Sequence, residues 1–429
     1  MSSLKHRIVK PMIAGAMVAA LAIPSLAATL PADGKIETSD TSINIPKSVT
    51  LYNDGYNKSY LPAITFSFSI APAAVDDTCT ITDDDGHTVT VMAGPANSIT
   101  NATSTAVFAE QEVVDTDASL DETVRANMTW NVDLTKFTKP GVYRYTITDT
   151  TSIALLYAAG ISRPAGYDTT RELDVYIKRG DSGDLEVMGY TLHDDIVGGI
   201  DTSTDKDPGF VPESYNGNVS NGFDTYTTYN YEVEKTITGG FADLSHSFPF
   251  AITLNKGTGF SGNLHYYGAK VASGATASPV DSTAASVNTT LGNGDKYVIY
   301  GLNPQASVSA KETNDTNDVY DLYVAVNGAS STAVSEQVAA GADSASYGGS
   351  AMSDYSTVNS ATNVSGDVTG LEAPKTTFRN DLPDIPITGV VLKSLPFVAL
   401  AGIGALMFGL SRKHKKNTVV DTESEDTAI

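Results

Sequence analysis

The sequence predicts an all-β protein made of two tandem β-sandwiches. Three observations carry this prediction. Short runs of alternating apolar and polar residues recur along the chain, bounded by Gly, Asn, Asp and Pro, which is typical of half-buried antiparallel strands. Between residues 28 and 388 no stretch carries a sustained helical period. A segment of about 360 residues is too long for one sandwich and suits two.

Four runs show the alternation most clearly. They are ITFSFSI at residues 64–70, YRYTI at 143–147, LDVYI at 173–177 and FPFAITL at 248–254. Each is expected to be a strand with one face on a core. The two halves of the chain also repeat one order of signals: a lysine in a strand, a Phe-x-Phe strand, an acid after an alternating strand, and a closing strand with Phe. The boundary is expected at residues 229–231, which gives domains over residues 28–229 and 230–381.

Two segments interrupt this pattern. Residues 194–222 are rich in Asp, Gly, Pro, Asn and Ser and lack periodicity. A loop of that length is usually functional or disordered. Residues 328–370 are rich in Ser, Ala and Gly, with few side chains able to fill a core. There we expect a surface excursion of the second domain with short irregular elements.

Both ends of the chain carry targeting signals. Basic residues precede an apolar segment at residues 12–23, and a small-x-small site ends at Ala27, which predicts a secretory signal peptide over residues 1–27. At the other end, the apolar run 390–410 is about long enough to cross a bilayer as a transmembrane helix. Basic residues at the start of the tail, 411–429, would hold it in the cytoplasm. The protein is therefore expected to be secreted and held at the cell envelope.

A pentapeptide, IPITG at residues 385–389, directly precedes the apolar run. In this order it resembles the LPxTG cell-wall sorting signal of Gram-positive surface proteins, with Ile385 in place of the usual leucine. In that signal a sortase cysteine attacks the threonine carbonyl, cuts before the glycine and passes the threonine to an amine. The resemblance assigns cleavage to the bond between Thr388 and Gly389, within a sorting region over residues 382–389. An ordinary membrane anchor is the alternative, but it leaves the pentapeptide unexplained.

Charge and cysteine content narrow the function further. The formal net charge of −23 disfavours nucleic-acid binding and keeps a displayed protein soluble. Cys79 is the single cysteine, so no internal disulfide forms, and it is expected to be a small buried strand residue. The histidines show no metal-ligand spacing, and no nucleophile elbow, P-loop or dinucleotide motif is present. We expect no enzyme, cofactor or metal site, and interpret the acidic run at residues 83–85 as a hairpin tip rather than a calcium site.

Several motifs carry a family resemblance. KPGVYRYTITD at residues 139–149 and YDTT at 167–170 are similar to motifs of the streptococcal pilin isopeptide-linkage family, which includes major (shaft) pilins. FPFAITL at 248–254, VSAKE at 308–312 and FRN at 378–380 resemble the second pilin domain of that family. The resemblance implies Ig-like sandwiches of the collagen-adhesin B type. Each is locked by an isopeptide bond between a lysine amine and an asparagine side chain, with help from a buried acid.

In the second domain the resemblance assigns the lysine to Lys235, the acid to Glu312 and the acyl partner to Asn380. The chemistry needs these residue types. An apolar core disfavours a charged ammonium and leaves a neutral amine that can act as a nucleophile. The same burial keeps Glu312 protonated, so that it polarises the Asn380 carbonyl and shuttles protons as ammonia leaves. An exposed ion pair and a turn asparagine are the plain alternative.

The first domain departs from the family pattern. Lys47 occupies the lysine position, and Asp149 stands where the family has glutamate, with a shorter side chain that must approach its partners more closely. No Phe-x-Asn motif marks the acyl partner. The family spacing, counted back from the second-domain lysine, leads to Asp224, which would lose water instead of ammonia. Asn221 is the alternative.

Polymerisation requires a lysine on the next subunit. Lys206 lies between turn-forming residues in the long loop before the first domain closes, where the family places its subunit-joining lysine in the equivalent connection. Lys178, at the start of a hairpin, is the alternative.

The sequence thus predicts a structural subunit of a sortase-assembled pilus, polymerised through Thr388. The expected partners are a pilin-type sortase, further copies of the subunit in a covalent homopolymer, and peptidoglycan, while a ligand on a host surface is left open. A monomeric wall-anchored adhesin or minor pilin is the first alternative. A wall-anchored hydrolase is the second, since clustered acids cannot be judged from sequence alone.

Overall fold

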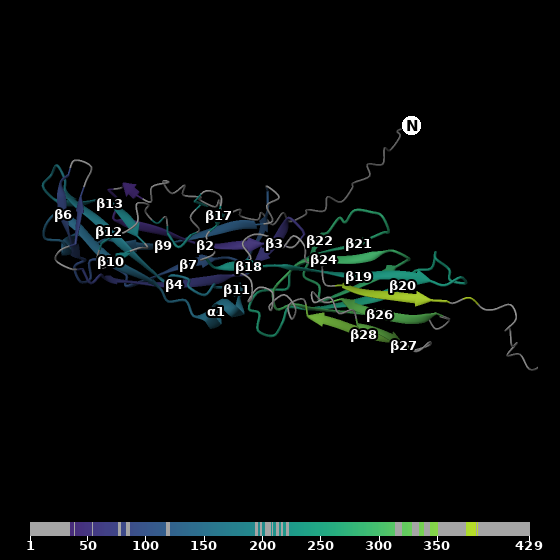
Figure 1. Ribbon diagram of the computed structural model, residues 1–429. Helices are drawn as coiled ribbons and strands as arrows, with labels where there is room; N and C mark the ends of the chain where they lie inside the picture. The colour runs from purple at the N-terminus through teal and green to yellow at the C-terminus, as the bar shows by residue number, and fades with distance from the viewer. Residues whose placement is uncertain are drawn as a thin grey trace, which may run out of the picture.

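The computed structural model forms an elongated molecule with two β-rich parts placed end to end (Figure 1). It describes residues 35–37, 39–53, 55–75, 79–82, 86–116, 121–193, 196–197, 200–201, 207, 209–211, 214–215, 218–219, 223–313, 320–327, 334–338, 344–350, 375–382 and 384. The predicted signal peptide, the IPITG motif and the apolar run at residues 390–410 lie outside this part of the chain. Within it, no helix is long and apolar enough to span a membrane.

The first part is a sandwich of two sheets. The larger has the order β1-β13-β12-β10-β4-β7, with β6 beside β10 and β5 beside β6, and the smaller has the order β11-β18-β2-β9. The bounds are β1 Lys35–Glu37, β2 Ser42–Tyr52, β4 Ile64–Pro72, β5 Thr80–Thr82, β6 Thr88–Ala93, β7 Thr103–Phe108, β9 Asp121–Asn131, β10 Gly141–Asp149, β11 Ile161–Ser162, β12 Thr170–Arg179, β13 Leu185–His193 and β18 Thr225–Thr227. Apolar side chains from both sheets, such as Phe66, Trp130 and Val175, form one core between them.

The second part repeats the arrangement. Its larger sheet has the order β22-β21-β24-β19-β29-β26-β27, and its smaller sheet the order β23-β20-β25-β28. The bounds are β19 Tyr229–Thr238, β20 Phe248–Asn255, β21 Tyr266–Val271, β22 Val280–Ser282, β23 Ser286–Leu291, β24 Lys296–Leu302, β25 Ser307–Thr313, β26 Asp321–Asn327, β27 Val334–Val338, β28 Ser344–Ser350 and β29 Lys375–Asp381. A second core, with Val233, Phe250 and Phe378, fills this sandwich, and the chain passes from one core to the other between Tyr226 and Tyr229.

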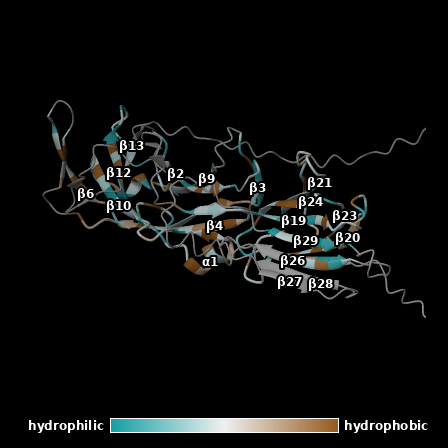
Figure 2. Ribbon diagram, turned by 45° about the vertical axis from the view of Figure 1, so that its right-hand side comes forward, coloured by the Kyte–Doolittle hydropathy of each residue, from teal (hydrophilic) through white to brown (hydrophobic). Residues whose placement is uncertain are grey.

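The predicted all-β class is confirmed. All four alternating runs are strands, namely β4, β10, β12 and β20. Figure 2 shows hydrophobic and hydrophilic residues interspersed along the strands of both parts. The other described elements are short: helices η1 (Leu134–Lys136) and α1 (Ile153–Ala158), and the two-stranded pairs β3 (Lys58–Leu61) with β8 (Gln111–Val114), β14 (Ile196–Val197) with β15 (Ile200–Asp201), and β16 (Ser214–Tyr215) with β17 (Asn218–Val219).

The segment over residues 328–370 differs from its prediction. Instead of irregular elements, it contributes β27 and β28, which extend both sheets of the second sandwich. Each is the last strand in the order given for its sheet, which puts it at an edge, and β28 pairs with β25 over seven residue pairs. Backbone hydrogen bonds to a single neighbour define such strands, so they need no alternating apolar pattern.

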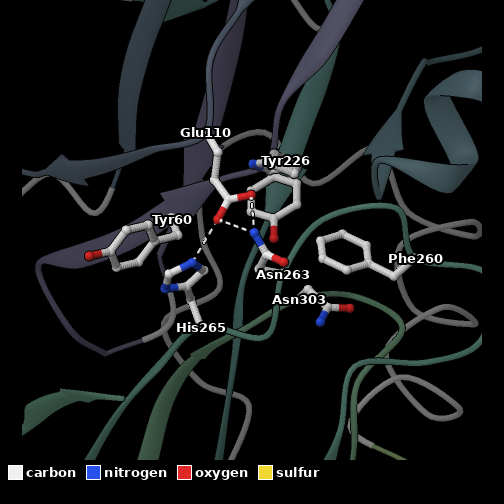
Figure 3. Close-up of a pocket in the computed structure, with 9 residues that line it drawn as sticks. Tyr60, Glu110, Tyr226, Phe260, Asn263, His265 and Asn303 are labelled. Atoms are coloured by element: carbon white, nitrogen blue, oxygen red, sulfur yellow. Dashed lines mark hydrogen bonds and ion pairs between the residues drawn. The ribbon is translucent and has the colours of Figure 1, made fainter. Parts of the chain in front are cut away.

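Polar and aromatic side chains from both sandwiches meet at their junction, around a small recess (Figure 3). A Glu110 carboxylate oxygen accepts from Asn263 Nδ2 at 2.9 Å and lies 2.7 Å from His265 Nε2. The Tyr60 ring stacks on His265, with ring centroids 3.8 Å apart. These contacts tie β3 and the turn between β7 and β8 to the segment that leads into β21, which restricts bending between the two parts.

Glu110→Ala is expected to loosen this junction, because Asn263 and His265 lose a charged acceptor. Hydrogen bonds to charged groups contribute about 1.5–3 kcal/mol, so proteolysis between the sandwiches should speed up about tenfold or more. Limited proteolysis and small-angle scattering measure the effect. Glu186→Ala, which removes a partly exposed carboxylate paired with Lys178, is the control. Equal cleavage rates in both variants would contradict the assigned role.

Candidate cross-linking sites

Three polar side chains lie together inside the second sandwich. Strand β19 alternates between buried and half-buried residues along its whole length, and this period places Lys235 on the core face beside Val233. Glu312 comes from β25 in the facing sheet. Asn380 comes from β29, where the same alternation turns Phe378 and Asn380 inward. Strand periodicity therefore puts three hydrophilic residues where apolar ones are the rule.

Glu312 bridges the other two members of this cluster. Lys235 Nζ donates to Oε2 at 2.8 Å, and Asn380 Nδ2 donates to Oε1 at 2.7 Å. All three residues are at most 2% exposed, and Lys235 Nζ lies 4.0 Å from the centroid of the Phe248 ring. Since β19 and β29 are parallel neighbours, the amine and the carboxamide stand on adjacent strands. The cluster holds a nucleophile, an acyl group and an acid in one dry space.

Within the described chain, the carboxamide oxygen of this cluster has no hydrogen-bond partner. Asn380 Oδ1 is buried and unsatisfied among the described residues, whereas its Nδ2 is bonded. Leaving a buried acceptor unpaired costs about 1–3 kcal/mol. A protonated Glu312 would donate to that oxygen once the amide turns over, which is the contact needed to polarise the carbonyl for attack.

A second cluster lies inside the first sandwich. Lys47 from β2 and Asp224, one residue before β18, are both fully buried, with Nζ 2.7 Å from Oδ2. β18 runs parallel to β2, with Thr225 opposite Thr50, which brings the two side chains to the same place in the core. An isolated parallel β-bridge also pairs the backbone of Lys47 with that of Phe210. This approach requires Gly209, whose φ is +140° and whose Cβ, if present, would lie 2.7 Å from the Pro46 carbonyl oxygen.

Asp149 takes part in this cluster indirectly. The sequence led us to expect a close approach of its short side chain to its partners. In the structure its Oδ2 accepts from Arg163 Nη2 at 2.7 Å and from the Tyr167 hydroxyl at 3.0 Å, and no ion pair joins it to Lys47 within the described chain. Arg163 also donates to both oxygens of Asp224, at 2.8 and 2.7 Å. An aspartate is too short to span the site, and the longer arginine and tyrosine bridge the gap.

Burial and the two carboxylates set the proton affinities here. Desolvation lowers the pKa of Lys47, although Asp224 opposes the shift. Desolvation and the neighbouring Asp149 raise the pKa of Tyr167, so it stays a phenol. Burial lowers the pKa of Arg163, but its hydrogen bonds to Asp224 outweigh this and the net direction is upward. The site therefore combines a weakened ammonium with a fixed guanidinium charge.

The remaining predicted residues fall into two groups. Those outside the described chain are the sortase-cleavage pair Thr388 and Gly389, the linking candidate Lys206 and the acyl alternative Asn221. Lys178 is described: it is half-exposed near the end of β12, with Nζ 3.0 Å from Glu186 Oε1.

Two residues of the first cluster were missed as site residues. Tyr167 opens the YDTT motif, and Arg163 directly follows the two-residue strand β11. The pairing of β11 with β18, with Ser162 opposite Thr225, carries Arg163 to Asp224. Such a short strand leaves no periodic signal in the sequence; the motif tyrosine was the only available hint.

Another buried charged group lies elsewhere in the first sandwich. Arg144 donates to both oxygens of Asp174 at 2.7 Å, and His193 Nε2 lies 3.2 Å from the same carboxylate. Cys79 is buried, as predicted, but it lies directly before β5 rather than in a strand, with Sγ 3.6 Å from Arg144 Nη1. Across the described residues no group of three or more His, Cys, Asp or Glu side chains is arranged to hold a metal ion.

Comparisons with known proteins found one family profile and several similar solved structures. A family profile described as a domain of unknown function, DUF7601, matches residues 229–347. No curated protein matches the chain. The solved structures similar to it include the major pilin of Streptococcus pyogenes, with 18% identity and a TM-score of 0.44, covering 79% of this chain and 99% of that one. A second S. pyogenes major pilin gives 18% identity and a TM-score of 0.41, covering 80% and 100%. A pilus-presented adhesin gives 16% identity and a TM-score of 0.24, covering 54% and 41%.

Proposed function

We propose that this chain is the structural subunit of a sortase-assembled pilus on a Gram-positive cell surface. Its two sandwiches are Ig-like domains of the collagen-adhesin B type, each closed by an intramolecular isopeptide bond. The observation that carries the proposal is the buried cluster of Lys235, Glu312 and Asn380. It joins the first and last strands of the second sandwich, and a plain structural role does not explain three polar side chains in one apolar core.

In the second sandwich, Lys235 Nζ attacks Asn380 Cγ as a neutral amine. Glu312 contacts both reactants, so it can donate a proton to the carbonyl oxygen and carry the amine proton to the leaving nitrogen. Ammonia leaves and an amide remains. In the first sandwich, Lys47 attacks Asp224 and water leaves. Each reaction happens once per chain, so the protein is its own reagent and turns over no substrate.

A cross-link at this place protects the molecule against pulling. Thr388 follows Asn380 by only eight residues, so force entering at a sorted C-terminus reaches β29 almost at once. The bond transfers that force to β19, the parallel neighbour of β29, before the intervening strands are loaded. This stabilisation does the work that disulfides do in other secreted proteins.

Successive subunits are joined through Thr388, which a pilin-type sortase transfers to Lys206 of the next copy. Support comes from the residue that follows Lys206: Asp207 is buried, its N–H bonds to Leu192 O at 3.0 Å, and its carboxylate accepts from Arg171. In this proposal, the anchored Asp207 supports presentation of the preceding lysine to an enzyme. The last subunit is attached to peptidoglycan, and Lys178 is the alternative acceptor.

The test is the size of the protein in cell-wall extracts boiled in SDS. A pilus subunit gives a ladder of high-mass bands, because amide bonds between copies survive denaturation. A monomeric wall-anchored adhesin or minor pilin, the second candidate, shares the sorting motif but gives one band of subunit size. A wall-anchored hydrolase also gives one band, together with activity on wall glycans. A single band would refute the polymer.

A further inference from the structure

The two cross-linking sites differ in how the acid reaches the reacting groups. In the second sandwich Glu312 hydrogen-bonds to both Lys235 and Asn380. In the first, Asp149 accepts hydrogen bonds from Arg163 and Tyr167. Arg163 in turn contacts Asp224, and Tyr167 contacts Lys47. If both sandwiches form a bond, as the proposed function holds, the first needs other groups to do what Glu312 does directly.

A continuous hydrogen-bonded path connects the amine to the acid. Lys47 Nζ donates to the Tyr167 hydroxyl at 3.0 Å, and that hydroxyl donates to Asp149 Oδ2 at 3.0 Å. The other oxygen of Asp149 is fixed by the Thr151 N–H at 2.9 Å, so Oδ2 stays turned toward the tyrosine. A hydroxyl can accept one proton while it passes on another, which is what a relay requires.

A guanidinium holds the acyl group from the other side. Arg163 Nε donates to Asp224 Oδ1 at 2.8 Å, while Nη2 donates to Oδ2 at 2.7 Å. The guanidinium lies over the Tyr167 ring, 4.1 Å from its centroid, and its side chain is 8% exposed. Donors fixed at both oxygens of an acyl group are placed to stabilise the negative charge that develops when the carbon is attacked.

We propose that Tyr167 and Arg163 are catalytic residues of the first-sandwich cross-link, Tyr167 as the proton relay to Asp149 and Arg163 as the oxyanion holder. A proton first crosses from Lys47 to Asp224, which gives an amine and a carboxylic acid. Nζ then attacks Cγ, a C–N bond forms, and the carbonyl electron pair moves to the oxygen that Arg163 holds.

The remaining steps balance without an outside reagent. The nitrogen gives one proton to Tyr167 as the hydroxyl passes its own proton to Asp149. The oxyanion electrons reform the carbonyl and the C–OH bond breaks beside the new amide nitrogen. Asp149 gives its proton back to Tyr167, whose hydroxyl passes its own proton to the departing hydroxide, so that water leaves and Asp149 is again a carboxylate. Lys47 and Asp224 become an amide whose oxygen keeps the hydrogen bond from Arg163.

Mass spectrometry of the full chain and its peptides tests these roles, with the second sandwich as an internal reference. Wild type should lose about 35 Da in total, and the peptides that contain Lys47 and Asp224 should be joined. In Tyr167→Phe, which lacks only the relay oxygen, the first bond should form about a hundredfold more slowly or not at all. The loss should then stop at about 17 Da, from the second sandwich alone. Arg163→Lys keeps the positive charge but loses the planar group that donates to both oxygens of Asp224. It should show the same reduced mass loss as Tyr167→Phe.

The reference for a folded but unlinked first sandwich is Lys47→Ala. Tyr167→Phe and Arg163→Lys should each resist proteolysis as well as Lys47→Ala does. Full loss of about 35 Da in either variant, at the wild-type rate, would overturn the role of that residue. So would digestion faster than that of Lys47→Ala, since the missing bond would then reflect a fold defect. A wild-type loss of about 17 Da alone would overturn the first-sandwich bond itself, and the inference with it, while the second-sandwich bond would stand.

Discussion

Glu312→Gln is expected to abolish the cross-link of the second sandwich and to lower its stability strongly. Glutamine keeps the shape of the side chain and can still hydrogen-bond to Asn380, but it cannot carry a proton between Lys235 and Asn380. Tying Lys235 to Asn380 closes a loop of roughly 146 residues, which by loop-closure entropy stabilises the fold by about 5 kcal/mol. For a domain of this size the melting temperature should fall by about 10–20 °C.

Calorimetry of both proteins, together with their intact masses, measures this effect. Glu234→Gln is the matched control: it lies one residue before Lys235 but faces outward, where it pairs with Lys375. A partly exposed pair of this kind contributes little, so that variant should melt within a few degrees of wild type. If Glu312→Gln lost the same mass as wild type, Glu312 would not be the assisting acid.

Lys206→Arg is expected to abolish the high-mass ladder in cell-wall extracts altogether. Arginine keeps the positive charge, but its delocalised guanidinium is not a nucleophile at neutral pH, so it cannot accept the threonine acyl group. Bonds within the subunit should be unaffected, because Lys206 is not one of the residues that form them. The chain should therefore appear as one band of subunit size, still secreted and attached to the wall.

Lys178→Arg is the matched control for that experiment. Lys178 is exposed, and it pairs with Glu186 near the end of β12, an ion pair that arginine can keep. Its ladder should match that of wild type. The opposite pattern, with the ladder lost only in Lys178→Arg, would move the junction to the end of the molecule formed by β12 and β13 (Figure 1).

The sequence predicted much of the fold because alternation is a local signal. Runs such as residues 248–254 carry it strongly, and each became a strand. Strands β27 and β28 were missed because they lie in a segment rich in Ser, Ala and Gly that shows little alternation; a neighbouring strand in the sheet defines each of them. Apolar alternation therefore predicts a strand only where the sequence itself alternates.

The site could be predicted where its residues lie in regular strands. Lys235 and Asn380 sit at inward positions of alternating strands, and the family motifs singled them out. Arg163 could not be predicted, because it reaches Asp224 only through β11, a two-residue strand that pairs with a segment 63 residues later. Tyr167 was visible as part of a motif, yet its contact with Lys47 depends on how a turn packs against β2.

Mass measurement of the fragment over residues 28–388 tests the central claim most directly. Two bonds that form by elimination of ammonia and water predict a mass about 35 Da below that calculated from the sequence. Joined peptides should pair Lys235 with Asn380 and Lys47 with Asp224. A mass equal to the calculated value would contradict the account, because the buried clusters would then be ordinary ion pairs.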